Sequence, residues 1–328
     1  MNSVLLTGTS TGFGRSAALE LARRGWRVFA SMRNLGSAQG LMEDAREASV
    51  AGIIEPVELD VTNETSIKAA VEHVFAQTGG PIDALVSNAG YSVLGAFEDL
   101  DDAVCRQQME TNFFGTLNLV RATLPAMRAA RKGRIVLISS SAVNSPHPLL
   151  SMYAASKWAL EGWAEGLAME VAPFGIDVAV LQPGAHRTPF ASNVHFVQPE
   201  ASAYRDWFTE AMPGVSNLDG WGRDPQLATQ PIVEAVCAAA VPFRQQIGED
   251  AQFFHVLKGT MPYELRALLL RAIVGLPGPN AYNDRPGATP KSAPEHSVLA
   301  QVLHAALPAL LADPATAKTL SQAFGFQA

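Results

Sequence analysis

A short apolar run followed by three closely spaced glycines opens the chain and limits the folds available to it. Residues 3–6 read SVLL, glycines stand at positions 8, 12 and 14, and residues 15–24 have a helical pattern. Glycine permits positive φ angles and close backbone approach, and the N-terminus of the following helix offers unpaired N–H groups to a pyrophosphate. This order predicts the start of a dinucleotide-binding α/β domain, with a purely structural turn as the alternative.

Further apolar runs continue the same pattern along the chain. Residues 26–31, 57–61, 82–86 and 135–138 read as buried strands, with helical stretches between them. Alternating strands and helices favour a parallel sheet. We therefore expect an α/β fold: a doubly wound Rossmann-type parallel sheet flanked by helices, with a helical C-terminal extension.

A long helix is expected from about residue 101 to 130. Its apolar residues recur at helical spacing and predict a stripe that faces the core, made of Phe113, Leu117, Val120 and Leu124.

The composition favours small-molecule chemistry. The chain has 328 residues, of which 48% are hydrophobic, so it can bury one large core. The net charge is -7 and the 24 basic residues are scattered, which argues against nucleic acid or an anionic membrane as a partner. Cys105 and Cys237 lack a metal-ligand spacing, so no metal site is expected. Without a basic leader or a membrane-length apolar run, we expect a soluble cytoplasmic protein with no membrane span.

Residues 135–160 place three reactive side chains near one expected strand end. Tyr153 and Lys157 are four apart in an Ala-rich stretch, so on a helix they share one face. A fixed ammonium favours the phenolate and lowers the pKa of a nearby phenol. Ser140 follows the apolar run 135–138, where the carboxyl end of a strand opens onto a ligand crevice. We expect Ser140, Tyr153 and Lys157 to converge there.

The end of the second expected strand bears on the choice of cofactor. NAD enzymes usually carry an acid about 20 residues after the glycines, where it binds the ribose 2′-hydroxyl. Here Ser31 and Met32 occupy that place, and Arg33 stands 19 residues after Gly14. A guanidinium can bind a 2′-phosphate with two hydrogen bonds. We therefore favour NADP(H) over NAD(H), with an ordinary surface arginine as the alternative.

Together these motifs resemble the short-chain dehydrogenase/reductase family. The matches follow the family's order: TGTSTGFG at 7–14, LDV at 59–61, SNAG at 87–90, Asn112, ISS at 138–140, YAASK at 153–157 and QPGAHRT at 182–188. Residues 158–176 are most similar to the branch that contains 17β-hydroxysteroid and retinol dehydrogenases.

The resemblance implies a catalytic role for four residues. Tyr153 exchanges a proton with the substrate oxygen during hydride transfer, while Lys157 lowers the pKa of Tyr153 and binds the nicotinamide ribose. Ser140 binds the substrate oxygen, and the thirteen-residue spacing to Tyr153 selects it over the serines on either side. Asn112 orders a water that connects Lys157 to solvent.

The resemblance also implies the cofactor contacts. Asp60 would contact the adenine, Asn88 the region of the ribose, and Thr188 the carboxamide, while His186 shapes the pocket. Ser87 stands where the family more usually has Asn, but Asn88 is retained. The full expected set is Gly8, Thr9, Ser10, Gly12, Phe13, Gly14, Arg33, Asp60, Val61, Asn88, Ala89, Gly90, Tyr153, Lys157, Pro183, Gly184 and Thr188.

The family carries a substrate-covering lid at residues 189–222, which here are irregular and aromatic. Large rings supply apolar contact area, so we expect a bulky, largely apolar secondary alcohol or ketone as substrate. The alternative is that the rings pack the lid onto the core. The aromatic residues are Phe190, Phe196, Tyr204, Trp207, Phe208 and Trp221.

We therefore expect an NADP(H)-dependent oxidoreductase of the EC 1.1.1 type. An epimerase or dehydratase on the same scaffold and a non-catalytic nucleotide-sensing protein are the alternatives. The dinucleotide-binding domain is expected over residues 1–255, and an extension over 256–328. An apolar stripe at 299–310 could pack on its own domain, cover the pocket or join a partner subunit. The family resemblance implies a homodimer or homotetramer.

Overall fold

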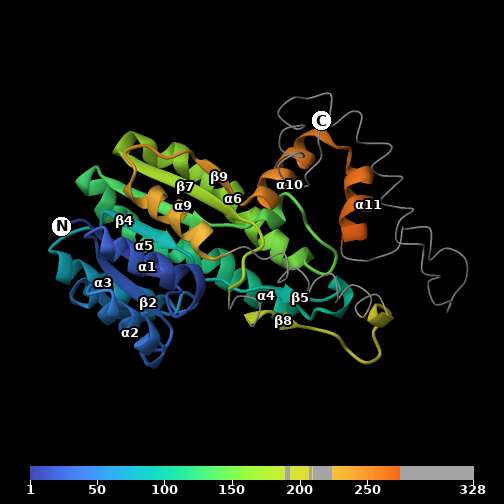
Figure 1. The fold of residues 1–328 in the computed structure, drawn as a ribbon, viewed down its shortest axis with the longest axis horizontal. Coiled ribbons are helices and arrows are strands. Elements are labelled where there is room, and N and C mark those ends of the chain that lie inside the picture. The colour runs from blue at the N-terminus through green and yellow to red at the C-terminus, as the bar shows by residue number, and fades with distance from the viewer. Residues whose placement is uncertain (189–192, 207–208, 210–223, 274–328) are drawn as a thin grey trace, which may run out of the picture.

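Parallel strands form the centre of the molecule (Figure 1). The computed structural model describes residues 1–188, 193–206, 209 and 224–273. Within these residues, seven strands pair in the order β3-β2-β1-β4-β6-β7-β9, and every pairing is parallel. Their bounds are β1 Ser3–Thr7, β2 Arg27–Met32, β3 Ile54–Glu58, β4 Ala84–Ser87, β6 Gly133–Ile138, β7 Ile176–Pro183 and β9 Arg244–Ile247.

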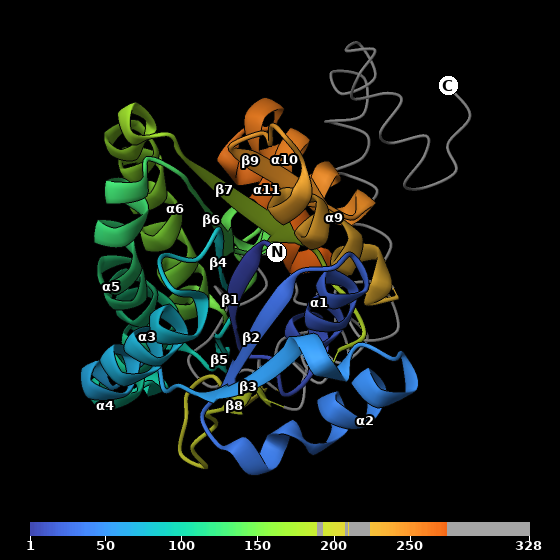
Figure 2. The ribbon, with the colours of Figure 1, turned by 90° about the vertical axis from the view of Figure 1, so that its left-hand side faces the viewer.

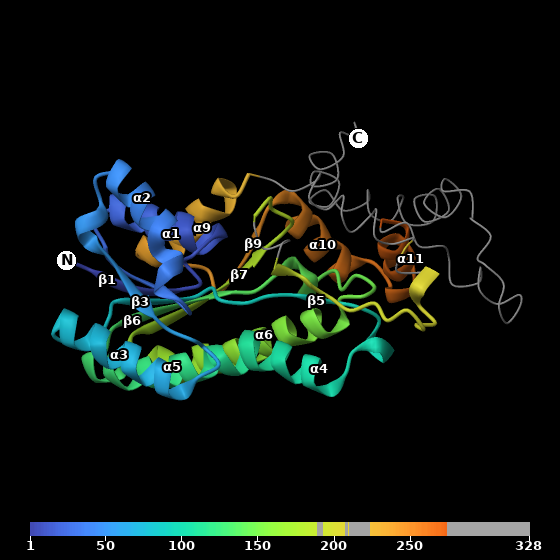
Figure 3. The same cartoon turned by 90° about the horizontal axis from the view of Figure 1, so that it is seen from below.

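Helices cover both faces of this sheet, as Figure 3 shows. One face carries α1 (Gly12–Arg23), α2 (Gln39–Glu47) and α9 (Gln226–Cys237). The other carries α3 (Glu64–Thr78), α5 (Gly115–Ala130) and α6 (Ser151–Val171). The expected doubly wound fold is confirmed.

The apolar strands are explained by burial on both faces. In β1, Val4 and Leu6 pack into the core under α1, while Leu5 points into the core on the opposite face. A strand in a covered parallel sheet reads as a continuous apolar run for this reason. Burying one such side chain contributes about 1.5–3 kcal/mol. The strands therefore form a rigid support for the loops at their carboxyl ends.

The strand order reverses between β1 and β4, as Figure 2 shows from the side. From β1 the chain moves outward to β2 and β3, and it then returns to place β4 on the other side of β1. Ligands of such sheets bind where the order reverses, in the crevice outside the carboxyl ends of the strands. The glycine turn after β1 and the loop after β4 both lie at this point.

The long helix expected over residues 101–130 is interrupted. It consists of α4 (Asp102–Met109), a π-helical turn at Glu110–Phe114, and α5. The π turn inserts extra backbone and rotates the face that follows it. The apolar stripe was therefore predicted only in part. Val120 is buried as predicted, whereas Phe113 and Leu124 are half-buried. The fully covered face of α5 also includes Thr116, Leu119, Thr123 and Met127.

The end of one strand also differs from expectation. The third strand ends at Glu58 rather than at residue 61, although Leu59 and Val61 are buried. Residue 255, the expected domain boundary, lies inside α10 (Glu249–Thr260). The helix α11 (Tyr263–Ile273) follows, and the apolar stripe at 299–310 lies outside the described residues.

A second, two-stranded sheet lies apart from the first. It pairs β5 (Val93–Leu94) with β8 (His195–Phe196) in parallel. Residues 193–206 of the expected lid are thereby attached to the loop after β4.

Among the described helices, none is long and apolar enough to cross a membrane.

Candidate active site

The glycine turn has the backbone geometry that its sequence predicts. Gly8 and Gly12 have φ angles of 70° and 57°, which side chains other than glycine rarely adopt. A Cβ atom at Gly14 would collide with the carbonyl oxygen of Gly8 and lie 2.7 Å from Nδ2 of Asn88. The three glycines therefore let the turn fold tightly against the loop that follows β4.

Hydrogen bonds of Asn88 and Thr7 connect these two loops. The Asn88 Nδ2 donates to the carbonyl oxygens of Thr7 at 2.9 Å and Gly8 at 3.2 Å. In return, the Thr7 Oγ1 accepts hydrogen bonds from the main-chain N–H groups of Asn88 and Ala89, both at 3.0 Å. The retained Asn88 thus holds the turn, and Ser87 instead bonds to Thr116 Oγ1 at 2.8 Å.

The start of α1 carries main-chain N–H groups that no side chain among the described residues caps. Thr11 caps this helix without a side-chain hydrogen bond to the first N–H groups. A Cβ added to Gly12 would meet the Thr188 Cβ at a contact distance of 3.7 Å, so Thr188 lies next to the turn. Free N–H groups at a helix N-terminus bind phosphate oxygens. These residues fit the pyrophosphate of a dinucleotide.

Three residues of the expected cofactor set, Thr9, Arg33 and Asp60, follow the carboxyl ends of β1, β2 and β3. Thr9 donates from its main-chain N and its Oγ1 to the Ser31 carbonyl oxygen, each at 3.1 Å, which joins the turn to the end of β2. Arg33, two residues further, is exposed. Asp60 instead uses its carboxylate within its own turn, where it accepts from Thr62 N at 2.9 Å and Oγ1 at 2.8 Å.

Tyr153 and Lys157 lie on one face of α6, and both are buried, with 8% and 5% of their surface exposed. The Lys157 ammonium donates a 2.9 Å hydrogen bond to the carbonyl oxygen of Ile138, at the end of β6. It also lies 5.9 Å from the centre of the Tyr153 ring. Ser140 makes a side-chain hydrogen bond with Tyr153, so the three predicted groups converge.

Burial shifts the pKa values of both ionisable groups towards their neutral forms. It raises the pKa of Tyr153 to about 12, against the hydrogen bond from Ser140, which acts to lower it. It lowers the pKa of Lys157 to about 8, against the negative charge of Glu161, which acts to raise it. The expected lowering of the Tyr153 pKa is therefore not found in the protein alone, because desolvation dominates. At neutral pH the phenol holds its proton.

Asn112 connects the π turn to this cluster. Its Oδ1 accepts from Tyr91 N at 3.1 Å, and its Nδ2 donates to Tyr91 O at 2.9 Å and to Ser156 Oγ at 3.0 Å. A Cβ added to Gly90 would lie 3.1 Å from Asn112 Oδ1 and 3.5 Å from Lys157 Nζ. Gly90, Asn112 and Lys157 therefore meet at one point.

The loop after β7 closes the site on another side. Pro183 ends that strand, and the Gly184 carbonyl oxygen lies 3.0 Å from Nδ1 of His186. The His186 ring meets the Phe13 ring edge-on, with centroids 5.2 Å apart. This contact joins the loop to the glycine turn, in keeping with the pocket-shaping role expected of His186.

Two residues of α10, which the sequence did not single out, hold loops at the site. The Asp250 carboxylate accepts from Ala185 N at 2.7 Å, and a Cβ at Gly184 would overlap this carboxylate. Lys258 donates to the carbonyl oxygen of Val143 at 2.8 Å, in the turn that follows Ser140. Neither residue belongs to a local motif, so only the fold reveals them.

Glu161 of α6, one turn beyond Lys157, was also missed, although its i,i+4 spacing was a visible signal.

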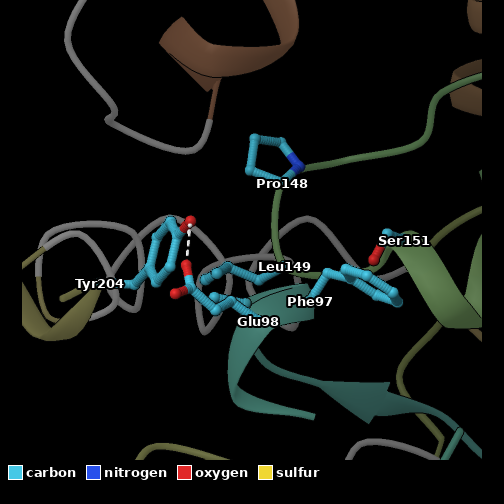
Figure 4. Close-up of a pocket in the computed structure, with 7 residues that line it drawn as sticks. Phe97, Glu98, Pro148, Leu149, Ser151 and Tyr204 are labelled. Carbon is cyan, nitrogen blue, oxygen red and sulfur yellow. Dashed lines mark hydrogen bonds between the residues drawn. The ribbon is translucent and has the colours of Figure 1, made fainter. Parts of the chain in front are cut away.

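A pocket of about 430 Å³ lies at the start of α6 (Figure 4). Apolar groups of Phe97, Pro148 and Leu149 line it together with Ser151. The Tyr204 hydroxyl donates to the Glu98 carboxylate at 2.9 Å, so the expected lid segment forms one wall. Phe196 is about half exposed, and Phe190, Trp207, Phe208 and Trp221 lie outside the described residues.

The fold and this arrangement define a Rossmann-type nucleotide-binding protein with a Ser, Tyr and Lys cluster at the strand ends. The chain belongs to the short-chain dehydrogenase family, whose model matches residues 2–196. The family assignment predicted from the motifs is confirmed. Its members are oxidoreductases that use nicotinamide dinucleotides.

Two curated relatives match most of the chain. A 3-ketodihydrosphingosine reductase of Bacteroides thetaiotaomicron is 33% identical over 271 residues, which cover 82% of this chain and 96% of the relative. Human retinol dehydrogenase 8 is 34% identical over 257 residues, which cover 74% of this chain and 80% of the relative. The second match supports the predicted branch.

Solved structures share the fold. A short-chain dehydrogenase from Streptomyces avermitilis has a TM-score of 0.69 and 33% identity, with 78% of this chain and 90% of the other covered. A single-residue variant of actinorhodin polyketide ketoreductase, solved with NADPH, has a TM-score of 0.64 and 27% identity. The match covers 75% of this chain and 94% of the other.

Proposed function

We propose that this protein is an NADP(H)-dependent oxidoreductase that interconverts a bulky, largely apolar secondary alcohol and its ketone. The observation that carries the proposal is the convergence of Ser140, Tyr153 and Lys157 near the glycine turn and the Asn88–Gly90 loop. Hydride transfer requires a held cofactor, a held carbonyl and a proton source, and this arrangement offers candidates for all three.

The bound nicotinamide would supply the hydride to the carbonyl carbon, or accept it from the alcohol. In the direction of reduction, Ser140 holds the substrate oxygen and Tyr153 donates its Oη proton to that oxygen. The raised pKa of Tyr153 keeps this proton in place at neutral pH. After transfer the buried Lys157 ammonium stabilises the phenolate, and in oxidation the phenolate takes the proton from the alcohol.

The cofactor would be held by the glycine turn, the Asn88–Gly90 loop and Lys157. Arg33 is exposed next to the end of β2, where it is free to meet a 2′-phosphate. The relative solved with NADPH supports the same preference.

The substrate class is supported by the pocket and by two relatives. Phe97, Pro148 and Leu149 offer apolar contact area. The relatives named after 3-ketodihydrosphingosine and retinol support a ketone or an alcohol as the reacting group.

A panel of ketones tested with NADPH and NADH side by side checks the proposal. We expect consumption of NADPH, followed through the absorbance of the reduced nicotinamide, with cyclic or long-chain apolar ketones. Turnover with no net change in that absorbance would indicate an epimerase or dehydratase instead. Activity confined to small polar ketones would contradict the proposed substrate class.

A further inference from the structure

A buried carboxylate lies one helical turn beyond Lys157 on α6. Glu161 has 4% of its surface exposed. Its oxygens accept hydrogen bonds from Ser139 Oγ, from Gln182 Nε2 at 2.8 and 2.9 Å, and from Arg244 Nε at 2.9 Å. An ionised carboxylate is found inside a protein only when such partners offset its lost hydration.

These partners belong to the strands that carry the active-site loops. Ser139 precedes Ser140 at the end of β6, and Gln182 precedes Pro183 at the end of β7. Gln182 in turn accepts at its Oε1 from Asn144 and Gln246, both at 3.0 Å. One carboxylate thus joins the helix of Tyr153 and Lys157 to the strand ends on either side of them.

The charges around Glu161 come from several elements. Lys157 lies on the same helix, Arg244 comes from β9, and Lys258 of α10 also lies within electrostatic range. Arg244 is about one-third exposed and shares its guanidinium with the more exposed Glu165 at 3.3 Å. Lys157 itself faces Tyr153 and the Ile138 carbonyl group.

We propose that Glu161 is a positioning residue of this active site. It holds the Ser140 turn and the loop after β7 at fixed positions relative to α6, and it keeps the Lys157 ammonium charged. The proposal rests on the function proposed above, in which Lys157 binds the cofactor. It assigns the buried carboxylate a role beyond packing, because both of its oxygens accept hydrogen bonds from the site's strands and its charge acts on Lys157.

The electrostatic part of the role has a definite sign. Burial disfavours the protonated form of Lys157, and a nearby negative charge favours it. Removing the charge of Glu161 must therefore lower the pKa of Lys157 further. A residue that served only to pack or to bond the strands would leave that pKa in place.

The test measures the Kd of NADPH against pH by tryptophan fluorescence, from about pH 6 to 10. In the wild type, the affinity for NADPH is expected to weaken as the pH rises, with a midpoint near the Lys157 pKa of about 8. Lys157→Met should bind weakly and lack this midpoint. Glu161→Gln, which keeps the shape and removes the charge, should move the midpoint to lower pH.

Glu165→Gln is the matched control. It makes the same charge change one turn further along α6 and loses the same Arg244 partner, but its carboxylate is mostly exposed. Its midpoint should equal that of the wild type. Glu161→Asp, which retains the charge, should stay closer to the wild-type midpoint than Glu161→Gln does.

The two proposals fail in different ways. If Lys157→Met keeps the pH dependence of the wild type, Lys157 does not bind the cofactor, and both proposals are overturned. If the midpoint depends on Lys157 but Glu161→Gln moves it by less than about half a pH unit, only the role of Glu161 is overturned. A shift of equal size in Glu165→Gln would also overturn it.

Glu161→Gln leaves Arg244 without its buried partner, so circular dichroism and the Tm accompany each titration. If that variant does not fold, Glu161→Gln combined with Arg244→Gln removes both charges and leaves two amides able to bond. The midpoint of NADPH binding should still move to lower pH in this double variant. Glu161 is the charge that raises the pKa of Lys157, one turn away on the same helix. An unchanged midpoint in the double variant would overturn the proposal.

Discussion

Lys258 on α10 donates a hydrogen bond of 2.8 Å to the carbonyl oxygen of Val143, in the turn that begins at Ser140. The same ammonium lies 3.5 Å from the centre of the Trp158 ring on α6. At its other end, α10 holds the loop after β7 through Asp250. One helix beyond the sheet therefore fixes two loops of the active site.

Replacing Lys258 with Met keeps the apolar stem and removes the bond to Val143. The loss of one charge-assisted hydrogen bond, worth about 1.5–3 kcal/mol, loosens the Ser140 turn, so we expect kcat/KM to fall about tenfold or more. Steady-state kinetics with an accepted ketone checks this. Lys68→Met, at an exposed position, should leave kcat/KM unchanged. Equal kinetics for both variants would mean that α10 does not support the turn.

Tyr153→Phe removes the proposed proton donor together with its hydrogen bond to Ser140. General acid–base groups contribute about 10²- to 10⁴-fold to rate, so kcat should fall within that range. The Kd of NADPH should change little, because the ring remains beside Lys157. A well-folded variant with the wild-type kcat would refute the proposed mechanism.

The buried Lys157 makes stability depend on pH. Its pKa falls from 10.5 to about 8 on folding, so below pH 8 both states hold the proton and the cost of burying the charge is present in full. From pH 8 to 10 the folded protein sheds the proton first, and that cost is progressively relieved. Relative to Lys157→Met, the wild-type free energy of unfolding in urea should therefore rise across this window. Tyr153 does not mask the trend, since its raised pKa lowers stability only above about pH 10.

Gly14→Ala should disrupt the cofactor turn, because the added Cβ would overlap the carbonyl oxygen of Gly8. Forcing an extra carbon into a tight site costs about 1–3 kcal/mol. We expect a lower Tm and weaker NADPH binding. Gly162→Ala offers a contrast, since nothing lies within 4 Å of the added atom in α6. That change should raise stability by about 0.5–1 kcal/mol.

Arg33→Ala tests the cofactor preference. A charge-assisted hydrogen bond contributes about 1.5–3 kcal/mol, so the Kd of NADPH should rise at least tenfold. The Kd of NADH, which lacks the 2′-phosphate, should change little. If both affinities fall equally, Arg33 acts through the structure of the turn. If neither changes, it is an ordinary surface residue.

Most of the fold could be predicted because its strands are buried on both faces. Such strands are continuous apolar runs, and β1, β4 and β6 lie within about two residues of their expected positions. The end of β3 could not be located this way, because Leu59 is buried although it lies beyond the strand. The π turn before α5 leaves no periodicity signal and was missed.

The site was predictable where its chemistry is local. Tyr153 and Lys157 are four apart, and Ser140 follows an apolar strand, so short-range patterns located them. Asp250 and Lys258 reach the site from far along the chain, and no local pattern links them to it. Burial also decides the direction of the Tyr153 pKa shift, and burial depends on packing that spacing does not reveal.

The interior position of β1 in the sheet constrains how the chain assembles during synthesis. This first strand pairs with β2 on one side and with β4 on the other. Ser3 N also donates to the Asp83 carboxylate, 80 residues away. Contacts of such long sequence separation form slowly, since a long loop must close first. A nascent chain therefore carries β1 with one open edge until β4 has left the ribosome, and during that interval it is open to mispairing.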